Sequence, residues 1–281
     1  MERCNKYRLI TEIGGVDRML YMVNPWSHGV LSARERRGGS PVCEIRRTKR
    51  KPRIRGSREN WNSPCRKRRR FFGKDHPNTA IFLNNLGVVY KTQGMYAKAE
   101  PLYKRALAIE TKQLGSNHPA TARSLNNLSE LYREQGRYAE AQPLCERSLA
   151  IRENQLGADH PSTAISLNNL ALLYYSQEEY GKAEPLYERA LAIYEKQLGS
   201  GHPSTGNSLN NLAQLYRAQE KYPEAESLYK RSLAIHEKES GADHPSTAGS
   251  LNNLAGLYKV QGKYTEAEPL YKRSLAICEK R

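Results

Sequence analysis

The chain has 281 residues, enough for one large domain or two ordinary ones, and 26% of them are charged. Its formal net charge of +16 is concentrated at one end, because residues 1–73 hold 20 of the 45 basic and 6 of the 29 acidic side chains. No apolar run approaches the ~20 residues needed to cross a bilayer, and the run at 19–23 is too short for a secretory leader. We therefore expect a cytoplasmic protein with no membrane partner.

The cysteines indicate neither a disulfide framework nor a zinc site. They are five in number, widely scattered and without a CxxC pair. A reducing compartment is therefore the expected setting, and no cofactor is expected. The five are Cys4, Cys43, Cys65, Cys145 and Cys278.

The first segment, residues 1–73, shows no sustained periodicity and contains two basic clusters, at 46–53 and 66–70. Such clusters are typical of disordered tails, of nuclear-import signals or of nucleic-acid contacts. We interpret the segment as a basic tail of low order. The alternatives are a nuclear location or nucleic-acid association through residues 46–70, and an upstream repeat that has been truncated.

From residue 74 onward the sequence repeats every 42 residues. His-Pro recurs from His76-Pro77 to His244-Pro245, and Leu-Asn-Asn-Leu keeps the same step. A period of this length indicates a solenoid or another repeat array. Five copies fill the rest of the chain, and we number them 1 to 5: 75–116, 117–158, 159–200, 201–242 and 243–281.

Each copy is predicted to hold two amphipathic helices. In copy 1, Leu83, Leu86 and Tyr90 fall on one helical stripe, and a turn is expected at 93–95. The second helix should end near Leu114, with Gly115 in the left-handed helical conformation. The proline of each His-Pro pair suits the first turn of a helix, and the residue two before it is a candidate N-cap. These candidates are Asp75, Asn117, Asp159 and Asp243.

Small residues should let the two helices of a copy approach each other closely. One such position in the first helix runs from Gly87 to Ala255, and one in the second from Ala99 to Ala267. Because no copy can bury its apolar stripe alone, neighbouring copies must stack. We predict an all-α fold: a right-handed α-solenoid of ten helices, with first helices on the concave face.

The spacing Leu83-x2-Leu86-Gly87-x2-Tyr90, followed by Ala99-x3-Tyr103, resembles the tetratricopeptide repeat (TPR) motif. The 42-residue period with His-Pro, Leu-Asn-Asn-Leu and Ala-Glu-Pro-Leu-Tyr resembles the repeats of kinesin light chains. The resemblance covers residues 74–281 and implies a protein-binding scaffold or adaptor. Kinesin light chains carry a heptad coiled coil that binds the motor heavy chain. No heptad is visible in residues 1–73, so the resemblance does not extend to motor association.

The expected ligand site is the concave groove, where an asparagine amide can donate to and accept from a peptide backbone. In TPR proteins the second asparagine of the pair contacts bound peptide, so the resemblance agrees. The second asparagines are Asn85, Asn127, Asn169, Asn211 and Asn253, and the first are Asn84, Asn126, Asn168, Asn210 and Asn252. The alternative is that these amides only bond between adjacent helices.

A further column on the same face is basic in four copies out of five, which favours a peptide with acidic flanks. Glu130 and Glu134 lie among these residues and should lower the local potential in copy 2. We expect an apolar peptide anchor to bind near copies 2 to 4. The column consists of Lys91, Arg133, Tyr175, Arg217 and Lys259.

Catalysis and metal binding have little support in the sequence. There is no Gly-rich phosphate loop and no Gly-x-Ser-x-Gly. One histidine per copy at a helix start is typical of cap structure rather than of a metal site. We therefore expect a non-catalytic protein. The sequence after residue 277 has no obvious polar capping helix, so a fragment of a longer array is an alternative.

Overall fold

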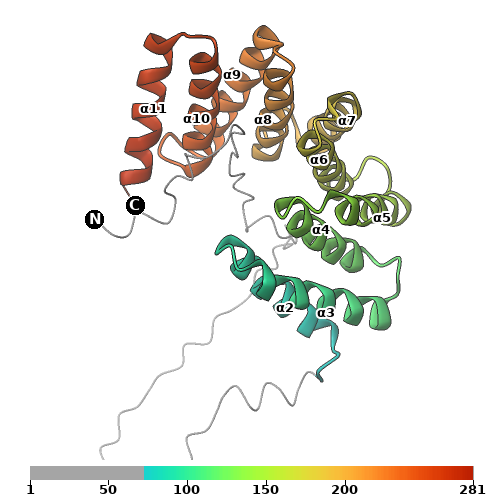
Figure 1. Ribbon diagram of the computed structural model, residues 1–281. Helices are drawn as coiled ribbons and strands as arrows, with labels where there is room; N and C mark the ends of the chain where they lie inside the picture. The colour runs from blue at the N-terminus through green and yellow to red at the C-terminus, as the bar shows by residue number, and fades with distance from the viewer. Residues whose placement is uncertain (1–72, 281) are drawn as a thin grey trace, which may run out of the picture.

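The computed structural model describes residues 73–280, and this part of the chain forms ten helices and no strand. Figure 1 shows them as five antiparallel pairs along one curved array. The expected α-solenoid is confirmed. The first helices are α2 Pro77–Thr92, α4 Pro119–Glu134, α6 Pro161–Ser176, α8 Pro203–Ala218 and α10 Pro245–Val260. The second helices are α3 Tyr96–Leu114, α5 Tyr138–Leu156, α7 Tyr180–Leu198, α9 Tyr222–Glu239 and α11 Tyr264–Glu279.

Each first helix begins at its proline, but the N-cap is the histidine before it. In copy 2, His118 has extended backbone angles, and its Nδ1 accepts a hydrogen bond from the Ala120 N–H at 3.1 Å. The prediction that Asp75, Asn117, Asp159 and Asp243 are the N-caps is therefore wrong, since they lie one residue outside the cap. In copy 3 the aspartate instead accepts from Lys196 Nζ, 2.5 Å from Asp159 Oδ2.

The turns lie where the sequence indicated. Gln93 is the C-cap of α2, and Gly94 has φ +71°, a value that favours glycine. Helix α3 ends at Leu114 as expected. Gly115 has φ +101° but ψ 159°, so the prediction of a left-handed helical conformation there is wrong.

Within a copy, the small residues bring the two helices into close contact. Ala99, Ala141, Ala183 and Ala225 are fully buried. At Gly87 a Cβ would lie 2.5 Å from Cε1 of Tyr103, so a larger residue there would force that ring to shift. Tyr103 and its equivalent Tyr229 are fully buried, and the equivalent Tyr187 is 1% exposed. The tyrosines therefore pack in the core between the helices.

Between copies, the second helix of one packs against the first helix of the next. The junction of copies 4 and 5 buries Tyr229 of α9 with Leu254 and Leu257 of α10. Successive first helices also contact one another, whereas second helices in the described residues show no comparable contacts with each other. The first helices therefore lie on the inner side of the curve, where a ligand groove was expected.

The basic clusters at 46–53 and 66–70 lie outside the described residues. The interpretation of residues 1–73 as a low-order tail thus stays a prediction.

Candidate functional site

The candidate site is the inner surface made by α2, α4, α6, α8 and α10, which we call the groove face. The fifteen residues predicted to bind a peptide all lie on these five helices. The structure places them in three different environments.

The first asparagine of the pair hydrogen-bonds to the next copy in three of the five copies. Asn84 Nδ2 donates to Ser124 Oγ at 2.7 Å, and Asn126 Nδ2 donates to Ser166 Oγ at 3.4 Å. Asn210 Nδ2 makes the same bond to the serine of copy 5, at 3.0 Å. These three asparagines are at most 8% exposed. These three therefore lie at the junction rather than in the groove, as in the alternative that the amides bond between adjacent helices. Asn168 and Asn252 are half-buried.

The second asparagine is nearer to solvent. Asn85 is exposed, and Asn127, Asn169, Asn211 and Asn253 are half-buried. Asn127 Nδ2 donates to Asn84 Oδ1 at 3.1 Å, so one of its N–H groups already bonds along the array. Peptide contact by this column stays a prediction.

The basic column is less uniform than its composition indicates. Lys91 Nζ lies 2.8 Å from Glu130 Oε1 and 3.5 Å from Glu134 Oε1, so two carboxylates of copy 2 offset its charge. Arg133 has a longer contact, 3.9 Å, with Glu134. Arg217 and Lys259 form no salt bridge within residues 73–280. The uncompensated positive charge therefore lies toward copies 4 and 5.

Copy 3 supplies an apolar surface at the centre of the groove face. Tyr175 interrupts the basic column, and its ring centroid lies 5.7 Å from that of Tyr180. Two further residues here were missed by the sequence reasoning: Ile165, which is 41% exposed, and Leu172, which is half-buried. The signal that could have revealed Leu172 is a departure from the repeat, since copies 2 and 4 have Glu130 and Gln214 there.

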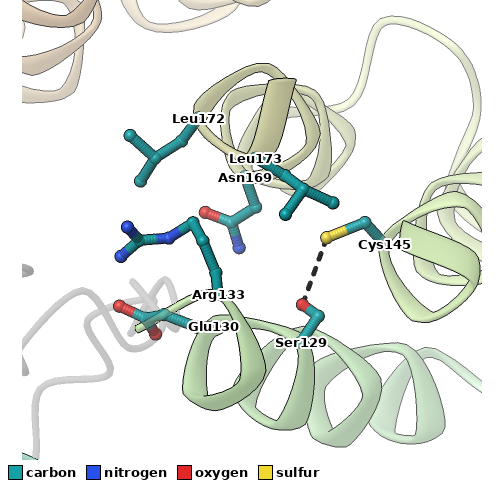
Figure 2. Close-up of a pocket in the computed structure, with 7 residues that line it drawn as sticks. All are labelled: Ser129, Glu130, Arg133, Cys145, Asn169, Leu172 and Leu173. Atoms are coloured by element: carbon teal, nitrogen blue, oxygen red, sulfur yellow. Dashed lines mark hydrogen bonds between the residues drawn. The ribbon is translucent and has the colours of Figure 1, made fainter. Parts of the chain in front are cut away.

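A small hollow opens beside this apolar surface (Figure 2). Arg133 and Glu130 face Asn169 and Leu172 across it, and Cys145 lies at its inner end. The other copies have a tyrosine at the position of Cys145, so the smaller side chain accounts for the space. The remaining residues around the hollow are Ser129 and Leu173.

Cys145 is unsuited to nucleophilic chemistry. Its Sγ donates to Ser129 Oγ at 3.2 Å, and the residue is 2% exposed. Burial raises the pKa of the Cys145 thiol to about 11, so the reactive thiolate is scarce near neutral pH. The hollow has room for about one water molecule, and the residues around it offer no activated group.

The described residues contain no group of three or more His, Cys, Asp and Glu placed to hold a metal ion. Each His-Pro histidine acts as an N-cap, as its position at a helix start indicated. Within the same residues, no helix is long and apolar enough to span a membrane.

A family model described as tetratricopeptide repeat matches almost the whole described region, in overlapping segments. The segments are residues 66–112, 83–144, 121–196, 173–238 and 204–280. No curated protein sequence matches the chain.

Solved structures with similar folds include nearly identical TPR-like repeats from Podosopora anserina, provisionally assigned as a kinesin light chain. A crystal structure of a point variant of these repeats is 33% identical, with a TM-score of 0.60. The match covers 73% of this chain and 97% of that one. A second crystal structure of these repeats has the same identity and coverage, with a TM-score of 0.58. BtubC (BKLC) from P. vanneervenii is 26% identical over 69% of this chain and 78% of that one, with a TM-score of 0.58.

Proposed function

Since the chain belongs to the tetratricopeptide repeat family, we propose that it is a non-catalytic scaffold that binds extended peptide segments of other proteins along its groove face. The repeats and their kinesin light chain-like neighbours support a protein-interaction scaffold. The observation that carries the finer proposal is the pattern on the groove face, where an apolar centre in copy 3 lies between arginines of copies 2 and 4.

The preferred peptide follows from this pattern. Leu172 and Tyr175 offer an apolar contact for one anchor side chain, and Arg217 offers a charge that no carboxylate of the described residues offsets. Asn169 and Asn211 can bond the peptide backbone between them. A few such bonds of ~0.5–1.5 kcal/mol each, together with one buried anchor, are consistent with micromolar affinity. The peptide would carry a Leu or aromatic anchor with acidic residues on its copy-4 side.

Fluorescence anisotropy with the full chain tests this directly. The probe is a labelled peptide with a central Leu and Glu residues on both sides, and the comparison peptide has Lys in place of Glu. We expect Arg217→Glu and Leu172→Asp each to weaken binding of the Glu peptide about tenfold, a loss of roughly 1.4 kcal/mol. Lys238→Glu is the matched control, because Lys238 is 81% exposed and lies on a second helix.

Two results would contradict the proposal. One is equal binding of the Glu and Lys peptides. The other is binding that is unaffected by both groove variants. Nucleic-acid association through residues 46–70 would instead give oligonucleotide binding that falls steeply between about 50 and 200 mM salt and ignores both groove variants.

A further inference from the structure

Helix α2 exposes apolar side chains at positions that every other first helix buries. Phe82 is 67% exposed, Leu86 43% and Val89 48%. In copy 2 the equivalent residues are Ser124, Leu128 and Leu131, and none is more than 3% exposed. In copies 2 to 5 this surface contacts the second helix of the preceding copy, and no described residue covers it in copy 1. We call Phe82, Leu86 and Val89 the α2 end face.

Helix α11 exposes the opposite half of the same junction. Leu275 is 57% exposed and Tyr264 is 67% exposed, whereas their equivalents in copy 4 are half-buried. Cys278 is also exposed, although its equivalent His236 is 1% exposed. We call Tyr264, Leu275 and Cys278 the α11 end face. The two end faces are thus the two sides of one kind of interface, which the array forms four times internally.

The side chains at the two end faces are complementary in size. Each internal junction has a large, buried residue of the second helix where the next first helix has a serine, and two of these pairs are hydrogen-bonded: Glu110 with Ser124 at 2.5 Å and His236 with Ser250 at 2.8 Å. At the end faces the sizes are reversed, since α11 has the small Cys278 and α2 has the large Phe82. A junction between α11 and α2 would therefore keep the total volume close to that of the internal ones.

Charge at the outer edge is complementary as well. Arg231 Nη2 lies 2.6 Å from Glu195 Oε1 of the preceding copy, and Arg273 repeats this pair with Glu237 at 2.5 Å. Continuing the same register would bring Glu279 of α11 to Arg105 of copy 1. One hydrogen bond would be missing from this junction. Asn252 would face Phe82, whereas the equivalent asparagines of other copies face a serine.

We propose that a second copy of this chain stacks head to tail, its α2 end face packing on the α11 end face of the first. The contact reproduces the internal junction, so the array continues from one molecule into the next. The interface is heterologous, and repetition gives rings or open filaments rather than a closed dimer. The inference is independent of what the groove face binds.

Sedimentation velocity of the full chain tests the proposal. We expect the weight-average mass to rise steadily with protein concentration from about 1 to 200 µM, a range that spans the dissociation constants of weak interfaces. Phe82→Asp disables only the α2 end face, and Leu275→Asp disables only the α11 end face. Each variant alone should stay monomeric. An equimolar mixture should form a species of twice the monomer mass and nothing larger.

Ala276→Asp is the matched control, because this alanine and its equivalents are exposed in every copy and lie outside the junction. It should associate as the wild type does, and its failure to do so would overturn the proposal. So would a wild type that is monomeric throughout, as expected if residues 1–72 cover the α2 end face. Self-association of Leu275→Asp alone would indicate a head-to-head contact and would also refute the proposal. Circular dichroism should first establish equal helicity.

Discussion

One buried position differs in every copy, although the surrounding sequence is nearly constant. Its occupants in copies 1 to 4 are Glu110, Arg152, Tyr194 and His236, all at most 7% exposed. Each reaches polar atoms near the next junction by a different route: Glu110 Oε2 accepts from Ser124 Oγ at 2.5 Å, whereas an Arg152 N–H donates to the Ser162 carbonyl at 2.7 Å. The junctions therefore share a backbone arrangement but not a set of contacts.

His236 has a matching change in its own copy, and this gives the first prediction. Copies 1, 2, 3 and 5 have alanine where copy 4 has Gly206, and a Cβ at Gly206 would lie 2.8 Å from His236 Nε2. We expect Gly206→Ala to lower the free energy of unfolding by roughly 1–3 kcal/mol, measured by urea denaturation, because the ring has no room to move. In a His236→Ala background the loss should largely disappear.

Gly249→Ala is the control for this cycle. No heavy atom lies within 4 Å of a Cβ there, so alanine should stabilise α10 by about 0.5–1 kcal/mol. Strict additivity of Gly206→Ala and His236→Ala would contradict the steric explanation.

The same histidine should make folding sensitive to acid. Its Nε2–H donates to the Pro203 carbonyl at 3.3 Å and its Nδ1 accepts from Ser250 Oγ, so the neutral ring is fully bonded. Burial lowers the pKa of His236 below its usual 6.5. As the pH falls through about 6.5, the unfolded chain therefore takes up a proton before the folded one, and the free energy of unfolding decreases.

Urea denaturation at about pH 7.5, 6.5 and 5.5 measures this loss, and the range spans the ordinary histidine pKa. We expect His236→Gln to lose less stability between the first and last pH than the wild type. The five N-cap histidines are present in both proteins, including His244, which acts on His236 electrostatically, so the comparison reports on His236. Identical slopes would show that the junction tolerates the imidazolium.

At the scale of the helix, the N-cap histidines should matter more than the aspartates before them. His160 Nδ1 accepts from the Ser162 N–H at 3.0 Å and so satisfies a donor at the start of α6. His160→Ala should lower the free energy of unfolding by about 0.5–2 kcal/mol, as loss of a side-chain cap usually does. Asp159→Ala should leave the urea midpoint nearly unchanged, since its ion pair with Lys196 is exposed to solvent. The reverse order would restore the aspartate as the functional cap.

The helices could be predicted because the sequence patterns that mark them recur five times. The candidate site could be predicted only in part. Apolar spacing and the His-Pro and Gly positions determine where helices begin and end. The same periodicity places both asparagines of a pair toward one side of a helix. It does not show which of the two amides hydrogen-bonds to a serine of the next copy. Nor does composition show that Glu130 and Glu134 offset Lys91, because this depends on how closely copies 1 and 2 approach.

At the scale of the whole molecule, the copies at the two ends of the array pack against fewer neighbouring helices than the copies in the middle. Each internal copy packs on two neighbours, whereas α2 and α11 each lack one within the described residues. Leu86 is 43% exposed and Leu275 is 57% exposed, against 3–5% for the equivalents of Leu86 in copies 2 to 5. In a solenoid, stability is close to a sum of intrinsic and nearest-neighbour contributions, so the end copies should open first.

Hydrogen–deuterium exchange measured by mass spectrometry should detect this difference in stability between the end copies and the central ones. At low protein concentration we expect backbone amides of α2 and α11 to exchange fastest, and those of α6 and α7 slowest, because opening the centre breaks two junctions and opening an end breaks one. Raising the concentration should slow exchange in α2 and α11 alone, since head-to-tail stacking covers those helices. Phe82→Asp should keep the gradient and lose its concentration dependence. Uniform protection from α2 to α11 at every concentration would mean that the array unfolds as a single cooperative unit, and the nearest-neighbour picture would then fail.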